Sequence, residues 1–223
     1  MRFHALACGL LACVLATGAA AQSSSSAADL AQALQKKYGT IRDFSTDFVH
    51  TYQGGVLKKQ ITEKGRLSIK KPGKMRWDYT SPEVKQFVSD GVKVYSYIPA
   101  DKQVMVGTVP QDDTAGSPAL FLTGKGDLIR DYTASIGEVP KGSAPTTRAL
   151  KLVPRKPQQD YDWLVLLVDA GSLALRGMVT VDAQGGTSVF TFNNLKENVG
   201  TPDKDFVFQM PRGVDVVTDA GAR

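Results

Sequence analysis

Cysteine is nearly absent from the chain, which limits how the fold can be stabilised. Cys8 and Cys13 are the only cysteines, and both lie in the first 21 residues, which we predict to be removed on export. No disulfide can then form, even in an oxidising compartment. Roughly 200 remaining residues are enough for one sizeable core without crosslinks. We predict a single domain over residues 29–217 and a flexible tail over residues 218–223.

Histidine is also scarce, and the motifs of common hydrolases are missing. Only His50 lies beyond the first 21 residues, and no H-x-x-x-H motif or Cys/His cluster is present to hold zinc. No G-x-S-x-G motif and no phosphate-binding glycine loop occurs. The acids Asp90, Asp169 and Asp182 stand at predicted turns, where hydrogen bonds to the backbone explain them. We predict no catalytic residue, no metal and no cofactor, and His50 as a surface residue; an exported hydrolase using a carboxylate pair is the alternative.

Only one long apolar run occurs, and it lies at the amino terminus. Arg2 precedes a nearly continuous apolar stretch, residues 3–16, and small residues follow up to Ala21. This pattern is typical of a secretory signal peptide, and the run is shorter than the roughly 20 residues that span a bilayer. We therefore predict residues 1–21 as a signal with cleavage after Ala21. Cleavage within "LLAC", which would make Cys13 a lipid anchor, is the alternative.

Beyond residue 40 the sequence predicts strands. Short segments rich in Val, Ile, Phe, Tyr and Thr recur between glycine-containing turns. Residues 84–99 predict two strands joined by a turn at Asp90 and Gly91. About ten or eleven strands are expected, the last over residues 205–217. Because no internal repeat and no strand–helix–strand rhythm appears, we predict a mainly β fold, a curled antiparallel sheet forming an open half-barrel.

Two other segments predict short helices. Residues 22–28, rich in serine, are predicted to be a flexible leader. Asp29 then fits a helix cap and Gly39 a helix end. The apolar face of this helix comprises Leu30, Leu34 and Tyr38. A second helix of one or two turns is predicted within residues 117–132, where Pro118 fits the start and the apolar residues are Leu120, Phe121 and Leu122.

The segment from Lys58 to Arg76 is strongly basic. It holds eight Lys and Arg residues against one acid, Glu63, although removal of Arg2 with the signal lowers the net charge of the whole chain from +5 to only +4. We predict no nucleic-acid partner, because the protein is exported. Two interpretations remain, a solvated hairpin face that discourages pairing between sheet edges and a docking surface for an acidic partner or an anionic membrane.

One predicted strand alternates between charged and large apolar residues. The apolar set is Met75, Trp77 and Tyr79, and the residues between them are charged. Because successive side chains of a strand point to opposite faces, one face is apolar and the other solvated. The apolar face is either a permanently packed core or a surface that binds an apolar ligand reversibly. For Tyr95 and Tyr97 the pattern does not decide which face they occupy.

Three neighbouring segments carry a specific combination of motifs. "GRLSIKKPGKMRWDY" is followed by "FVSDG" and "VYSYIP". The order of segments along the chain also includes the predicted signal, the leading helix, "SPALFLTG" and the closing "FVFQMPRGV". This arrangement resembles the outer-membrane lipoprotein carrier family, LolA, over essentially the whole chain after the signal.

The resemblance implies a fold and a function. It implies a half-open β-barrel closed by a lid of short helices, in the periplasm. Such carriers take acylated lipoproteins from an inner-membrane ABC-type release complex to a receptor at the outer membrane, with the acyl chains in the apolar concavity. We expect a monomer; a protein of the same fold that binds other lipids or senses stress is the alternative. The residues expected to contact acyl chains are Met75, Trp77, Tyr79, Leu120, Phe121 and Leu122, and those of the lid helix are Leu30, Leu34 and Tyr38.

At one position the chain departs from the family pattern. The family has an arginine latch immediately before a proline, and it bonds backbone carbonyls of the lid; here Lys71 precedes Pro72. Lysine keeps the charge but replaces a planar five-donor guanidinium with a compact ammonium. We therefore expect Lys71 to help hold the lid, either more weakly or with a different closure.

Overall fold

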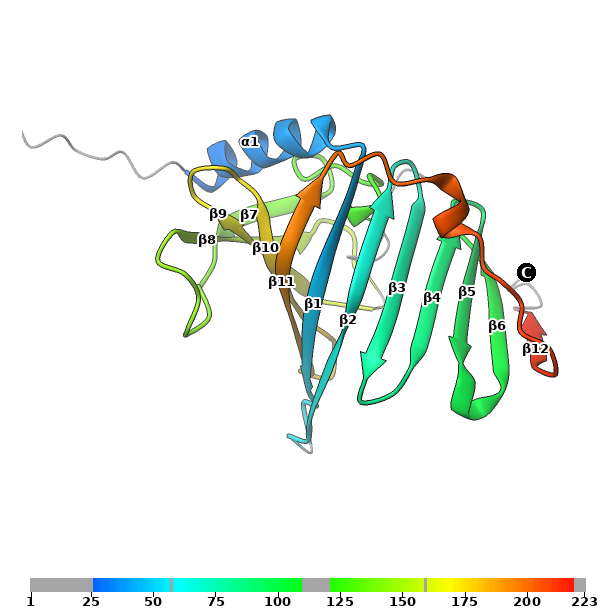
Figure 1. Cartoon of the computed structure of the whole chain (residues 1–223). Helices are drawn as coiled ribbons and strands as arrows, with labels where there is room; N and C mark the ends of the chain where they lie inside the picture. Colours follow the sequence, from blue (N-terminus) through cyan, green and yellow to red (C-terminus); the bar gives the residue numbers. More distant parts are fainter. Residues whose placement is uncertain (1–25, 57, 110–120, 159, 219–223) are drawn as a thin grey trace, which may run out of the picture.

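Twelve strands form one curled sheet in the part of the chain that the computed structural model describes, residues 26–56, 58–109, 121–158 and 160–218 (Figure 1). Their order across the sheet is β12-β6-β5-β4-β3-β2-β1-β11-β10-β9-β8-β7. Every neighbouring pair is antiparallel except β6 and β12, which are parallel. The strands are β1 (Asp43–Gln53), β2 (Gln60–Lys70), β3 (Lys74–Ser81), β4 (Lys85–Asp90), β5 (Lys93–Ile98), β6 (Gln103–Thr108), β7 (Tyr132–Ile136), β8 (Thr147–Pro154), β9 (Trp163–Asp169), β10 (Leu175–Val181), β11 (Thr187–Glu197) and β12 (Asp215–Thr218).

The predicted fold class is confirmed, and so is the predicted hairpin. Residues 84–99 contain β4 and β5, and the Asp90 carboxylate fixes the turn between them. Its Oδ1 accepts the backbone N–H groups of Val92 at 2.8 Å and Lys93 at 2.7 Å. Short side-chain-to-backbone bonds of this kind are the reason aspartate is frequent in turns.

The predicted last strand over residues 205–217 is wrong for most of its length. Asp203–Phe206 form a short 3-10 helix, η2, after Pro202, and only Asp215–Thr218 pair with β6. Pro211 interrupts the alternation and has no backbone N–H to donate to a ladder. A second 3-10 turn, η1 (Pro99–Asp101), connects β5 to β6.

The helix α1 (Ala27–Thr40) lies along one end of the curled sheet, on its concave side (Figure 1). Its cap is Ser26 rather than the predicted Asp29, because Ser26 Oγ accepts the N–H of Asp29 at 3.1 Å and the Asp29 carboxylate accepts the N–H of Ser26 at 3.1 Å. This reciprocal pair is a capping box. Gly39 lies inside the helix, which ends where the Ile41 N–H bonds the Tyr38 carbonyl at 3.2 Å.

One large apolar cluster fills the space between α1 and the concave face. The apolar residues of α1 are buried in it together with side chains from β1 to β3 and from β7 to β11. Burial of a large apolar side chain stabilises the fold by about 1.5–3 kcal/mol. The α1 members are Leu30, Ala31, Leu34 and Tyr38, and the strand members include Phe48, Leu67, Trp77, Leu152, Leu166 and Phe192.

The convex face carries the C-terminal segment around η2, which packs on β3 and β4 (Figure 1). Phe206 of η2 and Val88 of β4 are both buried there. Phe208 stacks on Tyr95, with ring centroids 5.0 Å apart, and meets Tyr97 edge-on at 6.1 Å. Tyr95 lies directly opposite Val88 in the ladder. Both tyrosines therefore face the convex side, which the sequence alone left undecided.

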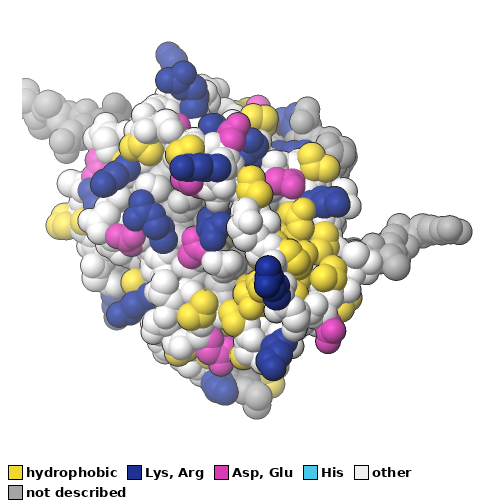
Figure 2. Space-filling view, turned by 45° about the vertical axis from the view of Figure 1, so that its right-hand side comes forward, with side chains coloured by type: hydrophobic (Ala, Val, Ile, Leu, Met, Phe, Trp, Pro, Cys, Tyr) yellow, Lys and Arg dark blue, Asp and Glu magenta, His cyan; other side chains and the backbone are white. Residues whose placement is uncertain are grey.

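The basic run is largely used within the molecule. Lys70 and Lys74 lie 2.7 and 3.1 Å from the Asp203 carboxylate, and Lys70 also donates to the Thr201 carbonyl at 2.8 Å. In Figure 2 the Lys and Arg side chains are spread over the surface, while hydrophobic side chains gather toward the side on which Figure 1 draws β5, β6 and β12. Lys70 and Lys74 of this run thus hold the C-terminal segment, a role that neither interpretation of the sequence included.

Several predictions fall on parts of the chain outside the described residues. These are the signal peptide, residues 22–25 of the leader, Leu120 and residues 219–223 of the tail. Within the described ranges, no helix has the length and apolar character needed to span a membrane.

Candidate functional site

The alternate apolar side chains of β3 lie on the concave face, beneath the lid. Here "lid" means α1 together with residues 121–124, which pack beside it. Met75, Trp77 and Tyr79 are almost buried, with exposed fractions of 8%, 5% and 8%. They belong to the same cluster as the apolar residues of α1. The predicted two-faced strand is confirmed; the binding of acyl chains by these residues stays a prediction.

An aromatic group surrounds Trp77 at the centre of the concave face. Phe48 lies with its ring centroid 5.2 Å from that of Trp77 and 4.9 Å from that of Tyr79, and Phe190 lies 5.3 Å from Trp77. Gly65 gives Phe48 its space, because a Cβ at this position would come within 2.7 Å of the ring. The sequence alone did not single out Phe48 and Phe190. The pairing of their strands is needed to show that both side chains point to the concave face.

The concave face becomes more exposed toward one edge of the sheet. Trp77 stands opposite Phe87, and the same row continues through Ser96 and Met105 to Val217. Residues directly opposite one another in a ladder share a face. Exposure rises from 5% at Trp77 to 55% at Met105 and 43% at Val217. The covered interior therefore opens toward β6 and β12.

The two parts of the lid contact each other through Tyr38. Its ring stacks on Phe121 with centroids 5.1 Å apart, and its hydroxyl donates to the Leu122 carbonyl at 3.0 Å. Phe121 and Leu122 have helical backbone and are buried, as predicted for the described part of the second segment. Gln35 also ties α1 to the residues that follow the second part of the lid, because its Oε1 accepts the Leu128 N–H at 2.9 Å. The lid is thus one connected unit.

Lys71 reaches the end of the lid helix. It follows β2, and its Nζ donates a hydrogen bond to the Tyr38 carbonyl in the last turn of α1. The same ammonium lies 3.6 Å from the centroid of the Tyr38 ring, a cation–π contact. Burial lowers the pKa of Lys71 to about 8. The side chain therefore keeps its charge at neutral pH and meets a carbonyl at the helix C-terminus, where a cation is favoured.

The turn between β2 and β3 also holds the second part of the lid. The Gly73 N–H donates to the Thr123 carbonyl at 3.1 Å. Gly124 has φ +87°, a region that favours glycine, and a Cβ there would come within 2.9 Å of Lys71 Cδ. The stem of Lys71 thus passes directly against residues 121–124. Both parts of the lid meet at this turn, and Lys71 contacts each of them.

His50 is not the surface residue that the sequence predicts. It lies within β1 on the concave side, and its side chain is only 14% exposed. Its Nδ1 lies 3.0 Å from a Glu63 carboxylate oxygen, and Lys85 binds the other oxygen at 2.5 Å. No local signal in the sequence marks this cluster, because its members come from three different strands.

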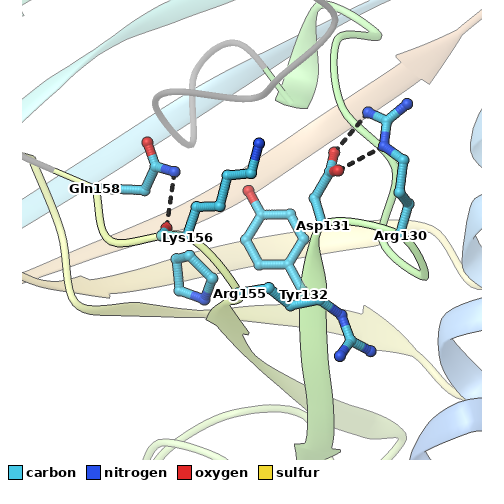
Figure 3. Close-up of a pocket in the computed structure, with 7 residues that line it drawn as sticks. Arg130, Asp131, Tyr132, Arg155, Lys156 and Gln158 are labelled. Atoms are coloured by element: carbon cyan, nitrogen blue, oxygen red, sulfur yellow. Dashed lines mark hydrogen bonds and ion pairs between the residues drawn. The ribbon is translucent and has the colours of Figure 1, made fainter.

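A separate hollow of about 260 Å³ lies beside β7 and the loop after β8 (Figure 3). Its charged groups are partly paired, since Arg130 Nε and Nη2 lie 2.6 and 2.8 Å from the Asp131 carboxylate. Met75, Trp77 and Tyr79 do not line it. Across the described ranges, no group of three or more His, Cys, Asp or Glu residues is placed to hold a metal ion. The hollow is lined by Arg130, Asp131, Tyr132, Pro154, Arg155, Lys156 and Gln158.

Comparisons with known proteins give a consistent result. The family model described as outer membrane lipoprotein carrier protein LolA matches residues 39–209. An outer-membrane lipoprotein carrier protein of Methylococcus capsulatus is 30% identical over 181 residues, covering 78% of this chain and 84% of the relative. One from Methylobacillus flagellatus is 34% identical over 155 residues, covering 69% and 72%.

Solved structures agree on the fold. An uncharacterized conserved protein from Thermus thermophilus matches with a TM-score of 0.50 at 12% identity, covering 86% of this chain and 98% of that one. At this identity the likeness concerns the fold alone. The family assignment rests instead on the sequence matches, which span most of the chain and include β3, the turn at Lys71 and the C-terminal segment. The chain belongs to the LolA family of outer membrane lipoprotein carrier proteins.

Proposed function

We propose that the protein is a periplasmic carrier, not an enzyme, that binds the acyl chains of lipoproteins released from the inner membrane and delivers them to an outer-membrane receptor. The observation that carries this proposal is the apolar concave face under a lid, in a chain whose relatives are named lipoprotein carriers. A predicted signal peptide with cleavage after Ala21 supports export. The proposed partners are acylated lipoproteins, an inner-membrane ABC-type release complex and the receptor, with the carrier acting as a monomer.

The energetics of acyl chains favour such a carrier. Each methylene exposed to water costs about 0.8 kcal/mol, so an acylated protein needs an apolar host to cross an aqueous compartment. We assign the contacts with the chains to the concave face and the inner side of the lid. Release must not need ATP, so the host has to hold the chains reversibly. The proposed contact residues are Met75, Trp77, Tyr79, Leu120, Phe121 and Leu122.

Closing and opening of the lid would couple to loading and release. In the closed state Lys71 bonds the Tyr38 carbonyl, and apolar side chains of the lid and sheet fill the concave face. Acyl chains would displace these side chains and move α1 away from the sheet. Return of the lid would then favour release of the chains to a receptor. Lys71 is the proposed latch in this cycle.

Mass spectrometry of the protein isolated gently from periplasm tests this function. We expect the intact mass of a chain that begins at Gln22 and carries no lipid. We also expect an acylated protein to co-purify with it. A co-purified free lipid without protein would favour the alternative, a lipid-binding or stress-sensing module of the same fold. A diacylglyceryl group on Cys13 would contradict the proposed processing.

A further inference from the structure

A polar cluster borders the apolar concave face and has no part in the function proposed so far. It consists of His50 in β1, Glu63 in β2 and Lys85 in β4. Glu63 links the other two, with its Oε2 3.0 Å from His50 Nδ1 and its Oε1 2.5 Å from Lys85 Nζ. The three side chains are 14%, 13% and 22% exposed. Partly buried charges of this kind need a reason, since removing them from water is costly.

The cluster lies at the rim of the concave face. His50 is two residues from Phe48 and therefore shares its face, and Lys85 Nζ lies 4.4 Å from the centroid of the Tyr79 ring. Ile61 lies on the same strand as Glu63, two residues further from the core, and is 42% exposed. The cluster thus stands where the buried aromatic group gives way to solvent. An acyl chain on the concave face would bring its polar end to such a boundary.

The hydrogen bonds assign the proton on His50. Burial raises the pKa of Glu63, but the hydrogen bonds from Lys85 and His50 outweigh it and the net shift is downward, so Glu63 is an ionised carboxylate. A carboxylate only accepts hydrogen bonds, so His50 Nδ1 must carry the proton that it donates. Burial lowers the pKa of His50 more strongly than Glu63 raises it, which favours the neutral ring. Nε2 is then a free lone pair, an acceptor.

This acceptor is buried without a hydrogen-bond partner among the described residues. Such atoms are rare in folded proteins, because an unmet hydrogen bond destabilises the fold. The imidazole is held flat against Phe190, with centroids 4.1 Å apart and planes 1° apart. Phe190 in turn contacts Trp77. Acyl chains that displace Trp77 and Phe190 would therefore also free one face of the ring that carries Nε2.

We propose that His50 Nε2 accepts a hydrogen bond from the amide N–H of an N-acylated amino terminus, so that the protein prefers amide-linked over ester-linked acyl chains. This inference rests on the proposed binding of acyl chains. An ester offers only acceptor oxygens and leaves Nε2 unpaired, whereas an amide supplies the donor that the site lacks. Glu63 and Lys85 act as positioning residues, because they fix the tautomer and the orientation of the ring.

A matched pair of probes tests the preference. N-dodecanoylglycine methyl ester has an amide N–H, and the dodecanoyl ester of methyl glycolate replaces only that N–H with oxygen. One net hydrogen bond corresponds to a preference of about three- to tenfold, so the wild-type protein should bind the amide probe that much more tightly. His50→Phe keeps a ring against Phe190 but removes Nε2, and should bring the ratio of the two Kd values close to one. Lys74→Ala on the convex face should leave the ratio unchanged.

The outcomes distinguish failure of this inference from failure of the proposed acyl-chain binding. If neither probe binds the wild-type protein, the proposed acyl-chain binding fails and the inference fails with it. If both bind with equal Kd, or if His50→Phe keeps the wild-type ratio, the inference is wrong while the carrier function stands. The ratio of the two Kd values is measured on the wild-type protein itself. It therefore tests the inference even if the His50→Phe protein does not fold. Glu63→Gln, which removes the carboxylate that fixes the ring, should lower the ratio as well.

Discussion

At the scale of single residues, Trp77 offers the most direct test of the concave face. Its ring lies between Phe48 and Phe190, so a carboxylate at this position would stand among apolar groups. We expect Trp77→Glu to lower the affinity for an acylated peptide at least tenfold, because acyl chains lose their apolar contact. Lys74→Ala, three residues away on the convex face, should change it little. Equal losses in the two variants, both checked for folding by circular dichroism, would contradict the assignment of faces.

Lys71 is the residue whose replacement should change transfer rather than binding. Charge-assisted hydrogen bonds contribute about 1.5–3 kcal/mol when shielded from water, so losing the bond to Tyr38 should shift the lid toward the open state roughly ten- to hundredfold. Lys71→Leu should accept cargo but deliver it poorly to receptor membranes, since closing no longer drives the chains out. Lys71→Arg should restore or exceed delivery. Unchanged delivery by Lys71→Leu in a transfer assay would show that this lysine is not a latch.

Some of these residues could be predicted from the sequence and others could not. The alternation in β3 has a period of two, so the parity of Trp77 follows from local sequence alone. The inward orientation of Phe48 and His50 does not, because β1 contains a register shift between Ser45 and Asp47 and its partners are distant in sequence. The contact of Lys71 with Tyr38 was expected only through the family resemblance.

At the scale of elements, Asp43 fixes the C-terminal segment to the start of β1. It is buried, and Oδ1 accepts the N–H groups of Val199, Gly200 and Thr201 at 3.0, 3.1 and 3.3 Å and the Thr201 hydroxyl at 3.1 Å. Its Oδ2 also accepts the Gly200 N–H at 3.2 Å. We expect Asp43→Asn to lower the free energy of unfolding by about 2–3 kcal/mol, because an amide nitrogen in place of Oδ2 would face this donor and a neutral amide oxygen accepts the other donors more weakly than a carboxylate. Urea denaturation measures the change.

A nearby acid provides the control for this prediction. Asp47 lies in the same strand and is about half exposed; its carboxylate makes a long ion pair with Arg66 at 3.7 Å and accepts an exposed hydrogen bond from Asn194 Nδ2 at 2.8 Å, which an amide oxygen can also accept. Asp47→Asn should therefore cost no more than about 0.5 kcal/mol. If the two variants lose the same free energy of unfolding, the bonds from Asp43 do not anchor the C-terminal segment.

The pH dependence of stability follows from the same carboxylate. Burial raises the pKa of Asp43, but the hydrogen bonds from residues 199–201 outweigh it, so the net shift is below the ordinary value of 3.8. A lowered carboxyl pKa means that the unfolded state binds more protons in acid. Its contribution is present above pH 3.8 and is lost as the pH falls through the folded pKa. We expect wild-type stability to fall more steeply than that of Asp43→Asn below about pH 4.

Elements with strong local signals were predicted well, and those that depend on packing were not. The β4–β5 hairpin has an Asp-Gly turn between alternating strands, so the local sequence is sufficient. The start of α1 was misplaced because Ser26 and Asp29 are both residues that suit a helix cap. Only the hydrogen bonds between them show that Ser26 is the cap. Residues 205–217 look like a strand in composition, but Phe206 and Phe208 pack against the sheet instead of pairing in it.

At the scale of the whole molecule, the closed form leaves little room for cargo. Protein interiors are close-packed, so acyl chains can enter the covered region only if side chains and whole elements move. The sheet is held by continuous backbone ladders. The lid is held to the sheet by apolar packing and by a few polar contacts, chiefly those of Lys71 and Gly73 and the ion pair of Lys37 with Glu197 at 2.9 Å. The lid is therefore the part of the molecule that should yield.

Hydrogen exchange of the loaded and unloaded protein tests this expectation. A helix of 14 residues is marginal in water without tertiary contacts, so amides of α1 should exchange faster once it leaves the sheet. We expect binding of an acylated peptide to lower protection in α1 and in residues 121–132 while β8 to β10 stay protected. Lys71→Leu without cargo should show the same pattern in weaker form. Unchanged or higher protection of α1 on loading would mean that the chains bind without moving the lid, for example along the exposed row that ends at Met105 and Val217.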